Sequence, residues 1–320
     1  MNICTLRHRI IPLLVLLWLG CHPANAQFDV QFSHYWALRS FYNPACTGLA
    51  KKLNINGTYS SQLSGFTRNA KTMYFGADMP LVFVNEKHNV GLGFFNESIG
   101  LFTNQRFFAQ YAFRTHLLGG QFGGGLQIGL LNESFDGSKV DLGEESGGSD
   151  PAFPTSEVTG SGLDIGLGFY YEHPWFYAGL SVAHLNAPTL ILGESNEIKI
   201  DPTYYFIGGG NIRMKNPFLS IQPSVMLQTD GVVFRTDITG RLVYTNDGKS
   251  YYGGLGYCPG TSCTFLIGAL FQGVNFGYSY ELFTNEIGAG NGSHNLFVGY
   301  QMNLDFFKKG KNKHKSIRIL

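Results

Sequence analysis

The segment Gly162–Tyr171, with the sequence GLDIGLGFYY, alternates between large apolar residues and small or polar residues. Its apolar positions are Leu163, Ile165, Leu167 and Phe169. The positions between them carry Asp164, Gly166 and Gly168. Successive side chains of a β-strand point to opposite faces, so the segment predicts a strand with one apolar and one small, polar face. A water-soluble sandwich would have large apolar residues on both inner faces, whereas a membrane barrel places the apolar face against lipid.

The same two-residue period recurs along the chain. In 294–305 one face carries Leu296, Val298, Tyr300, Met302 and Leu304. The opposite face is small or polar except at Phe297. Many of the predicted strands are about 8–12 residues long, which suits a tilted strand that crosses a bilayer. Fourteen strands are predicted, at residues 53–60, 72–79, 89–96, 105–117, 121–134, 162–171, 175–184, 203–213, 219–228, 234–244, 251–259, 265–272, 274–280 and 294–305.

The connections between these strands alternate in length. After even-numbered strands they are short, at 118–120, 172–174, 214–218, 245–250 and 273, with 80–88 as the longer case. All the long connections follow odd-numbered strands, at 61–71, 135–161, 185–202 and 281–293. Outer-membrane barrels have short periplasmic turns and long extracellular loops. The sequence therefore predicts an all-β fold, a transmembrane antiparallel β-barrel of about 14 strands. An even strand count places both termini on the short-turn, periplasmic side.

Aromatic residues gather near the ends of several predicted strands. They occur at 170–171, 175–177, 204–206 and 251–252. Girdles of aromatic residues mark the two membrane–water interfaces of such barrels. Ordinary aromatic packing inside a core is the alternative interpretation of the same residues.

Composition also favours a membrane barrel. Charged residues make up 14% of the chain, whereas soluble domains average about 25%. The mean hydropathy is −0.02, and glycine accounts for 42 of the 320 residues. After the first 26 residues, no stretch of about 18 apolar residues predicts a membrane helix. The net charge is +1, and the basic excess is confined to the end of the chain, so nucleic-acid binding is not expected.

The N-terminus has the features of a secretory signal peptide. Two arginines and a histidine precede the apolar run 10–19, and Ala24-Asn25-Ala26 supplies the small residues of a cleavage site. A lipoprotein cysteine at Cys21 is the alternative. The basic end of the chain is either a solvated tail or a contact for an acidic partner or anionic headgroups. The predicted regions are a signal peptide (1–26), an N-terminal periplasmic arm or plug (27–52), the outer-membrane β-barrel (53–307) and a basic periplasmic tail (308–320).

Three cysteines follow the predicted signal peptide: Cys46, Cys258 and Cys263. Cys258 and Cys263 flank a Pro-Gly-Thr-Ser turn, so in an oxidising compartment they form either a disulfide or two free thiols. The chain contains no CxxC pair after the signal peptide. We therefore predict no metal site at Cys46.

The stretch Gly277–Tyr300, GYSYELFTNEIGAGNGSHNLFVGY, raises the question of a hydrolase. Ser293 and His294 are adjacent, but neighbouring residues on a strand point to opposite faces and do not form a catalytic pair. The chain has no G-x-S-x-G elbow. We expect this stretch to form the penultimate strand, an outer loop and the last strand. Neither a catalytic residue nor a cofactor is predicted.

Two further segments contain residue types that occur in ligand sites. The acidic stretch 136–145, DGSKVDLGEE, lacks the D-x-D-x-D-G spacing of a calcium loop and is expected to be a solvated outer loop. The three glycines at 208–210 lie in a strand pattern with no helix after them, which indicates a kink or a close approach rather than a phosphate loop. No metal site is predicted.

Several short motifs together resemble the ordered landmarks of the PorP/SprF family. The N-terminal motif comprises Gln31, Phe32, Ser33, His34, Tyr35, Asn43, Pro44, Ala45 and Gly48. The central motifs are Asp78-Met79-Pro80, Asp150-Pro151-Ala152-Phe153 and the run 181–188 that contains His184. The C-terminal motif comprises Tyr278, Tyr280, Glu281, Ser293, His294 and Asn295. The family more usually has Asp and Glu where Glu281 and Asn295 stand here.

The resemblance implies a non-enzymatic barrel in the outer membrane of Bacteroidetes that serves the type IX secretion and gliding machinery. The implied partners are periplasmic ring components of that machinery, secreted surface proteins with C-terminal sorting domains, and membrane lipid. The motif residues are then candidate interaction positions. A solute channel or transporter is the alternative, because the inner face of the barrel is predicted to be polar and rich in glycine.

Overall fold

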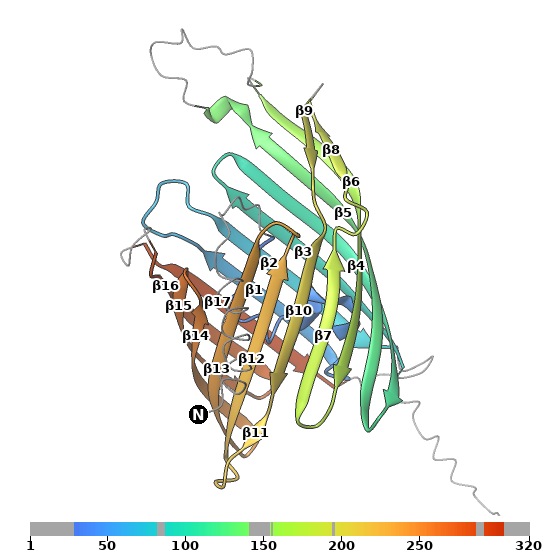
Figure 1. Cartoon of the computed structure of the whole chain (residues 1–320), viewed down its shortest axis with the longest axis vertical. Helices are drawn as coiled ribbons and strands as arrows, with labels where there is room; N and C mark the ends of the chain where they lie inside the picture. The colour runs from blue at the N-terminus through green and yellow to red at the C-terminus, as the bar shows by residue number, and fades with distance from the viewer. Residues whose placement is uncertain are drawn as a thin grey trace, which may run out of the picture.

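The computed structural model describes residues 29–81, 87–140, 154, 156–193, 196–285 and 291–303. These residues form a closed antiparallel barrel of fourteen strands, as predicted (Figure 1). Strands pair in chain order, and the pairings β1–β17 and β10–β12 close the circle. The wall strands are β1 (Leu53–Ser61), β2 (Lys71–Pro80), β3 (His88–Ile99), β4 (Phe102–Leu117), β5 (Gly120–Asp136), β6 (Glu157–Glu172), β7 (Phe176–Ala183), β10 (Thr203–Gly210), β12 (Leu219–Thr229), β13 (Phe234–Asn246), β14 (Lys249–Cys258), β15 (Ser262–Phe271), β16 (Val274–Phe283) and β17 (Ser293–Met302).

The strand ends differ from the prediction mainly on the side of the long loops. β6 begins at Glu157 rather than at residue 162, and it stays paired with β5 as far as Asp136. The predicted loop 135–161 is therefore shorter than expected. At the other end, the predicted strand 203–213 is interrupted at Asn211, and the short β11 (Ile212–Arg213) pairs with β12 alone.

A hairpin lies within the predicted long loop 185–202. It consists of β8 (Thr189–Leu192) and β9 (Asn196–Lys199), which pair with each other and not with the wall. Leu190 and Leu192 are buried, and Leu190 lies so close to Gly162 of β6 that a Cβ on this glycine would collide with it. The hairpin therefore packs against the extended part of β6 (Figure 1).

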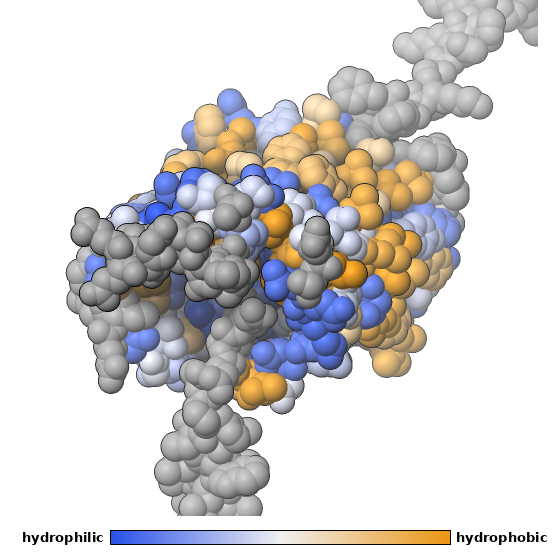
Figure 2. Space-filling model, turned by 90° about the horizontal axis from the view of Figure 1, so that it is seen from above, coloured by the Kyte–Doolittle hydropathy of each residue, from blue (hydrophilic) through white to orange (hydrophobic). Residues whose placement is uncertain are grey.

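The outer face of the wall is apolar, as the two-residue period predicts. In β6 the large residues Leu163 and Phe169 are exposed, while Asp164 and the glycines between them are buried on the inner face. Seen from the long-loop end, hydrophilic residues gather around the mouth and hydrophobic residues lie along the flank (Figure 2). No helix in the described part of the chain is long and apolar enough to cross a membrane.

Residues 29–50, called the plug below, lie inside the barrel (Figure 1). They contain the short helix α2 (Arg39–Tyr42) and the 3-10 turn η1 (Pro44–Cys46). Their hydrogen-bond partners come from β4, β6, β7, β10, β12, β13 and β17. These strands surround the barrel, and only a segment in the lumen can reach all of them. No part of residues 29–52 forms an arm that projects from the barrel.

Aromatic side chains of the plug pack against aromatic side chains that point inward from the wall. Phe32 and Tyr35 belong to one buried cluster with Phe95 and Phe297. Phe297 is the apolar exception on the inner face of the last strand, and it stacks on His34 with 5.7 Å between ring centroids. The exception in the alternating pattern therefore marks a contact with the plug.

The apolar wall gives a first prediction, at the middle of β5. Ile128 is 59% exposed there, whereas Ile191 is 56% exposed on β8, outside the wall. Because an arginine at the mid-depth of a bilayer is costly, Ile128→Arg should lower the free energy of unfolding in lipid by about 2–4 kcal/mol. The matched change Ile191→Arg should cost less than about 0.5 kcal/mol. Denaturant unfolding in bilayers measures both, and equal losses would contradict a lipid-facing position for Ile128.

Candidate functional site

The plug turns at Asn43 and Pro44, two residues of the N-terminal motif. Asn43 Oδ1 accepts a hydrogen bond from the Ala45 N–H (2.9 Å) and so caps η1. Pro44 occupies the first position of that turn, where no N–H is needed. Asn43 Nδ2 donates to the carbonyl oxygens of Phe169 in β6 (3.0 Å) and Leu180 in β7 (3.2 Å). One side chain thus shapes the turn and attaches it to the wall.

Glycines in three adjacent wall strands leave room for this turn. A Cβ on Gly125 of β5 would collide with the backbone of Pro44, and a Cβ on Gly168 of β6 would collide with Asn43. A Cβ on Gly179 of β7 would lie 2.9 Å from Asn43 Nδ2. The glycine-rich inner face, which the sequence offered as support for a channel, here allows close packing of the plug.

One of two charged anchors holds the end of the plug that leads into β1. The Arg114 guanidinium on β4 donates to the carbonyl oxygens of Ala45 (3.1 Å), Thr47 (2.9 Å) and Gly48 (3.2 Å). Asp78 Oδ1 on β2 accepts from the Gly48 N–H at 2.8 Å. Gly48 has φ +74°, a left-handed conformation that glycine adopts readily. The chain therefore leaves the lumen through a fixed turn.

The other end of the plug is held by a buried group of charged side chains, called the Asp29 cluster below. Arg106 on β4 donates to both carboxylate oxygens of Asp29, at 2.8 and 3.3 Å. The Tyr205 hydroxyl on β10 donates to Asp29 Oδ2 at 2.7 Å. His184, which follows β7, places Nδ1 2.8 Å from Asp164 Oδ1 on β6 and Nε2 3.6 Å from Asp29 Oδ2. The cluster joins the plug to four strands or their ends.

Two carboxylates and two cations balance each other in the Asp29 cluster. Burial alone would raise the pKa of Asp29, but the Arg106 guanidinium, the nearby His184 ring and the hydrogen bond from Tyr205 hold it well below its usual range. Burial alone would lower the pKa of His184, but the hydrogen bond to Asp164 and the nearby Asp29 carboxylate raise it to about 9. Protonated His184 donates from both ring nitrogens. The 3.2 Å approach of Arg106 Nη1 to His184 Nε2 is then a contact between two donors.

The remaining N-terminal motif residues lie between the two anchors. Phe32 is fully buried, and the Tyr35 hydroxyl donates to the carbonyl oxygen of Asp237 in β13 at 3.3 Å. Gln31 and Ser33 lie with Tyr35 beside β13 and line a cavity of only 20 Å³. The structure therefore places the whole N-terminal motif in the lumen, where it contacts the wall of its own chain.

The C-terminal motif is divided between the two faces of the wall. His294 is exposed on the outside, where Nδ1 lies 2.8 Å from the Tyr278 hydroxyl and the ring lies 5.1 Å from that of Tyr280. Ser293 is buried, and its Oγ accepts from the Leu63 N–H at 3.2 Å. Ser293 and His294 thus point to opposite faces, as strand geometry requires.

Cys258 and Cys263 are free thiols, so the disulfide considered for them is absent. In the hairpin of β14 and β15, Cys258 pairs with Ser262 and Cys263 pairs with Tyr257. Cys258 is buried on the inner face, whereas Tyr257, opposite Cys263, is exposed on the outer face. The two sulfur atoms therefore point to opposite sides of the wall.

Several predicted features lie outside the described residues. They are Asp150 and Pro151, the signal peptide 1–26 and the tail 308–320. Within the residues that the structure does describe, no group of three or more His, Cys, Asp and Glu side chains could hold a metal ion.

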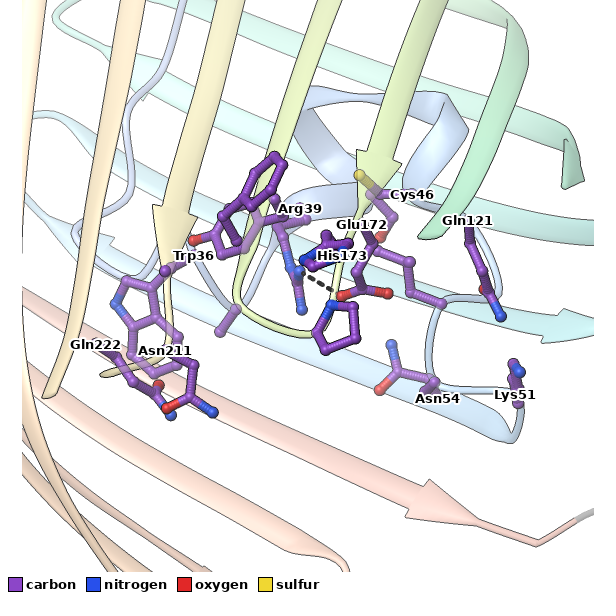
Figure 3. Close-up of a pocket in the computed structure, with 18 of the residues that line it drawn as sticks. Trp36, Arg39, Cys46, Lys51, Asn54, Gln121, Glu172, His173, Asn211 and Gln222 are labelled. Atoms are coloured by element: carbon purple, nitrogen blue, oxygen red, sulfur yellow. Dashed lines mark ion pairs between the residues drawn. The ribbon is translucent and has the colours of Figure 1, made fainter. Parts of the chain in front are cut away.

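The lumen contains a cavity at each end of the plug. The cavity at the short-turn end has a volume of about 760 Å³ (Figure 3). Figure 3 shows Trp36 and Arg39 of the plug above it and Glu172, His173 and Gln222 of the wall and turns around it. The cavity at the long-loop end has a volume of about 440 Å³ and is lined by acidic residues that include Asp29, Glu97 and Glu133.

The sequence prediction missed most residues of the two anchors. Among the members of the Asp29 cluster it singled out only His184, and it did not identify Asp29, Arg106 or Arg114 as anchors. The signal present in the sequence was a charged residue at an inward position of a strand, such as Arg106 within QRFFAQ. An inward charge requires a partner in the lumen, and the plug is the segment available to supply one.

The Asp29–Arg106 pair gives a second prediction. Removal of one partner leaves the other charge buried, so Asp29→Asn and Arg106→Gln should each lower the free energy of unfolding by about 3–5 kcal/mol. The double variant should lose at least about 2 kcal/mol less than the sum of the single changes, because the two residues interact directly. Denaturant unfolding of the four proteins measures this coupling.

The exposed pair of Lys199 and Asp201 provides the control for that cycle. Its atoms are 3.0 Å apart, but solvent screens the charges, so its coupling should be below about 1 kcal/mol. If the coupling of Asp29 with Arg106 were equally small, the Asp29 cluster would not be an anchor of the plug.

A third prediction follows from the raised pKa of His184. Its stabilising contribution is complete below the ordinary value of 6.5 and is lost as the pH rises through about 9. The free energy of unfolding should therefore fall between pH 6.5 and 9, by at most about 1.4 kcal/mol per pH unit for one proton. His184→Gln should remove this part of the pH dependence of the free energy of unfolding. Every other titrating group is present in both proteins, so the difference between their profiles reports on His184. Identical pH profiles for the two proteins would show that His184 is not protonated in the cluster.

Solved structures with a similar fold are outer-membrane proteins of low sequence identity. The Pseudomonas putida toluene transporter TodX is 10% identical with a TM-score of 0.45, over 86% of this chain and 95% of that chain. A Pseudomonas aeruginosa FadL homologue is 11% identical with a TM-score of 0.47, over 82% and 93%. The Acinetobacter baumannii outer membrane protein Omp33 is 7% identical with a TM-score of 0.43, over 79% and 98%.

Comparison with curated protein sequences gives no match. Comparison with protein families does give a match, which covers nearly the whole described barrel together with the plug. The family described as type IX secretion system membrane protein PorP/SprF matches residues 24–300. The matched range contains both anchors of the plug, the first strand of the barrel and all but the final two residues of the last strand. The chain therefore belongs to the PorP/SprF family of type IX secretion system membrane proteins.

Proposed function

We propose that this protein is a non-enzymatic part of the type IX secretion and gliding machinery in the outer membrane, and that it helps to export or anchor surface proteins through protein–protein contacts. Membership of the PorP/SprF family carries this proposal. The inner charged residues support it, because Asp29, Arg106 and Arg114 are already used to hold the plug.

The two ends of the barrel then provide separate binding surfaces. On the long-loop side, the hairpin of β8 and β9 and the paired extensions of β5 and β6 rise beyond the other strands (Figure 1). We propose that this side contacts secreted surface proteins. On the opposite side, Leu118 and Trp175 are strongly exposed at the tips of two short turns. Exposed apolar residues of this kind suit contacts with periplasmic ring components.

A fourth prediction tests this division between the two ends. Chemical crosslinking in intact cells, followed by capture of the tagged protein, should recover both ring components and surface proteins. When residues 189–199 are replaced by a short Gly-Ser linker, capture of surface proteins should fall at least about fivefold. Ring components should still be recovered, because the short turns are unchanged.

Replacement of residues 230–233, a loop on the same side of the barrel, serves as the control. It should leave the capture of ring components and of surface proteins unchanged. Recovery of surface proteins by the hairpin variant at the wild-type level would exclude the hairpin as their contact. If the wild-type protein captured neither a ring component nor a surface protein, the proposed function would be wrong.

A solute channel is the second candidate function. The cavities of about 760 and 440 Å³ at the two ends of the plug support it. Conductance across a planar bilayer distinguishes the two functions. A steady, ion-selective current through the purified wild-type protein would favour the channel, whereas the plug anchored at both ends leads us to expect no such current.

A further inference from the structure

A buried arginine at the short-turn end of the lumen has an unusual environment. Arg241 on β13 is only 6% exposed, and its guanidinium lies 3.4 Å from the ring centroid of Trp36 in the plug. A Cβ on Gly254 of the neighbouring strand would lie 2.8 Å from Arg241 Cγ, so this glycine makes room for the stem of the side chain. Arg241 and Trp36 both line the cavity of about 760 Å³.

The guanidinium of Arg241 has no hydrogen-bond acceptor among the described residues, and its Nε is a buried donor without a partner. Other arginines in the lumen do have acceptors. Arg39 donates to the Tyr170 hydroxyl at 2.6 Å and lies 3.6 Å from Glu172 (Figure 3), and Arg235 pairs with Asp237 at 3.1 Å. Since arginine stays protonated in proteins, Arg241 carries an unbalanced positive charge beside the cavity.

Further unpartnered polar groups surround Arg241. Within the described ranges, the Trp36 indole Nε1–H is a buried donor without an acceptor, and the Tyr252 hydroxyl, whose ring lies 5.2 Å from that of Trp36, has no partner either. The Asn275 amide lines the same cavity with its Oδ1 unpaired, and amide oxygen and nitrogen positions are interchangeable by a flip. A buried donor is destabilising unless it is paired, so an acceptor in the cavity would stabilise Arg241, Trp36 and Asn275, which line it.

We propose that the cavity at the short-turn end is a binding site for a carboxylate group, with Arg241 as the residue that pairs with it. A carboxylate accepts two parallel hydrogen bonds from a guanidinium. It carries one negative charge, which balances the charge of Arg241, the buried cation for which the described part of the chain offers no acceptor. A phosphate group carries more charge and would be repelled by Glu172 and Asp78, which line the same cavity.

The position of the cavity limits the source of this carboxylate. The wall of strands separates the cavity from lipid, and the cavity lies at the end of the barrel that carries the short turns. The group must therefore arrive from the periplasmic side, on a free solute or on a protein segment. A volume of about 760 Å³ lies in the range of ordinary ligand sites.

A fifth prediction tests the carboxylate site with purified full-length protein in detergent. In a Trp175→Phe background, Trp36 is the one tryptophan beyond the first 26 residues, and its fluorescence should change on titration with N-acetylglycine. The neutral analogue N-acetylglycinamide should give no change. In the same background, Arg241→Gln should weaken the binding of N-acetylglycine at least about tenfold, because a charge-assisted pair is lost. Circular dichroism melting verifies that this variant is folded.

Lys51→Gln is the matched control, because it removes the same charge from an exposed position on the rim of the same cavity. It should alter the affinity less than about twofold. Equal weakening by the two variants would show general electrostatic attraction and overturn the site. The absence of a response to N-acetylglycine, or tighter binding of inorganic phosphate, would also overturn it.

The source of the carboxylate is decided by a capped pentapeptide, Ala-Ala-Glu-Ala-Ala, and its Gln counterpart. Tighter binding of the Glu peptide than of N-acetylglycine, lost in the Gln peptide, would assign the site to a protein segment. Equal affinity for the peptide and for N-acetylglycine would assign it to a free solute. Both results support a carboxylate site. The binding measurements do not involve the secretion machinery, so their outcome is independent of the proposed function.

Discussion

Lipid offers no hydrogen-bond partner to a peptide group, and this constraint determines the rest of the structure. A sheet in lipid must close on itself, which it does here where β1 pairs with β17 from Leu53↔Met302 to Ser61↔His294. Closure creates a lumen, and the lumen of fourteen strands is wide enough to hold more than wall side chains. The alternating residues of each strand therefore face two environments, lipid on one side and the plug on the other.

The plug is held by directional contacts at its ends and by aromatic packing between them. Burial of Asp29 and Arg106 has a large desolvation cost, which their mutual attraction offsets only when the geometry and the remaining hydrogen bonds are good. Tyr205 supplies a further hydrogen bond to Asp29, and His184 adds an ion-pair contact at 3.6 Å. Apolar packing alone would tolerate small shifts of the plug, whereas a carboxylate held by several donors fixes one position. Charge in the lumen thus specifies where the plug lies as well as contributing to stability.

The wall could be predicted from the sequence because each strand repeats the same local pattern. The plug contacts could not, because the Asp29 cluster joins residues that are distant in sequence, such as Asp29 and Arg106 with a separation of 77. One irregularity did carry information: Phe297 breaks the polar face of β17 because His34 stacks on it. The free thiols of Cys258 and Cys263 follow from the register of one hairpin, which a count of turn residues does not provide.

The two anchors limit what the barrel can do. Displacement of the plug from the wall would separate Asp29 from Arg106 and the Arg114 guanidinium from three carbonyl oxygens, and each separation leaves a buried charge without its partner. A change at one anchor alone does not free the plug, since the other still holds it. Passage through the lumen would therefore require a partner that replaces both sets of contacts at once. Contacts at the two mouths require no such replacement, and this difference in cost favours a protein that acts through its ends.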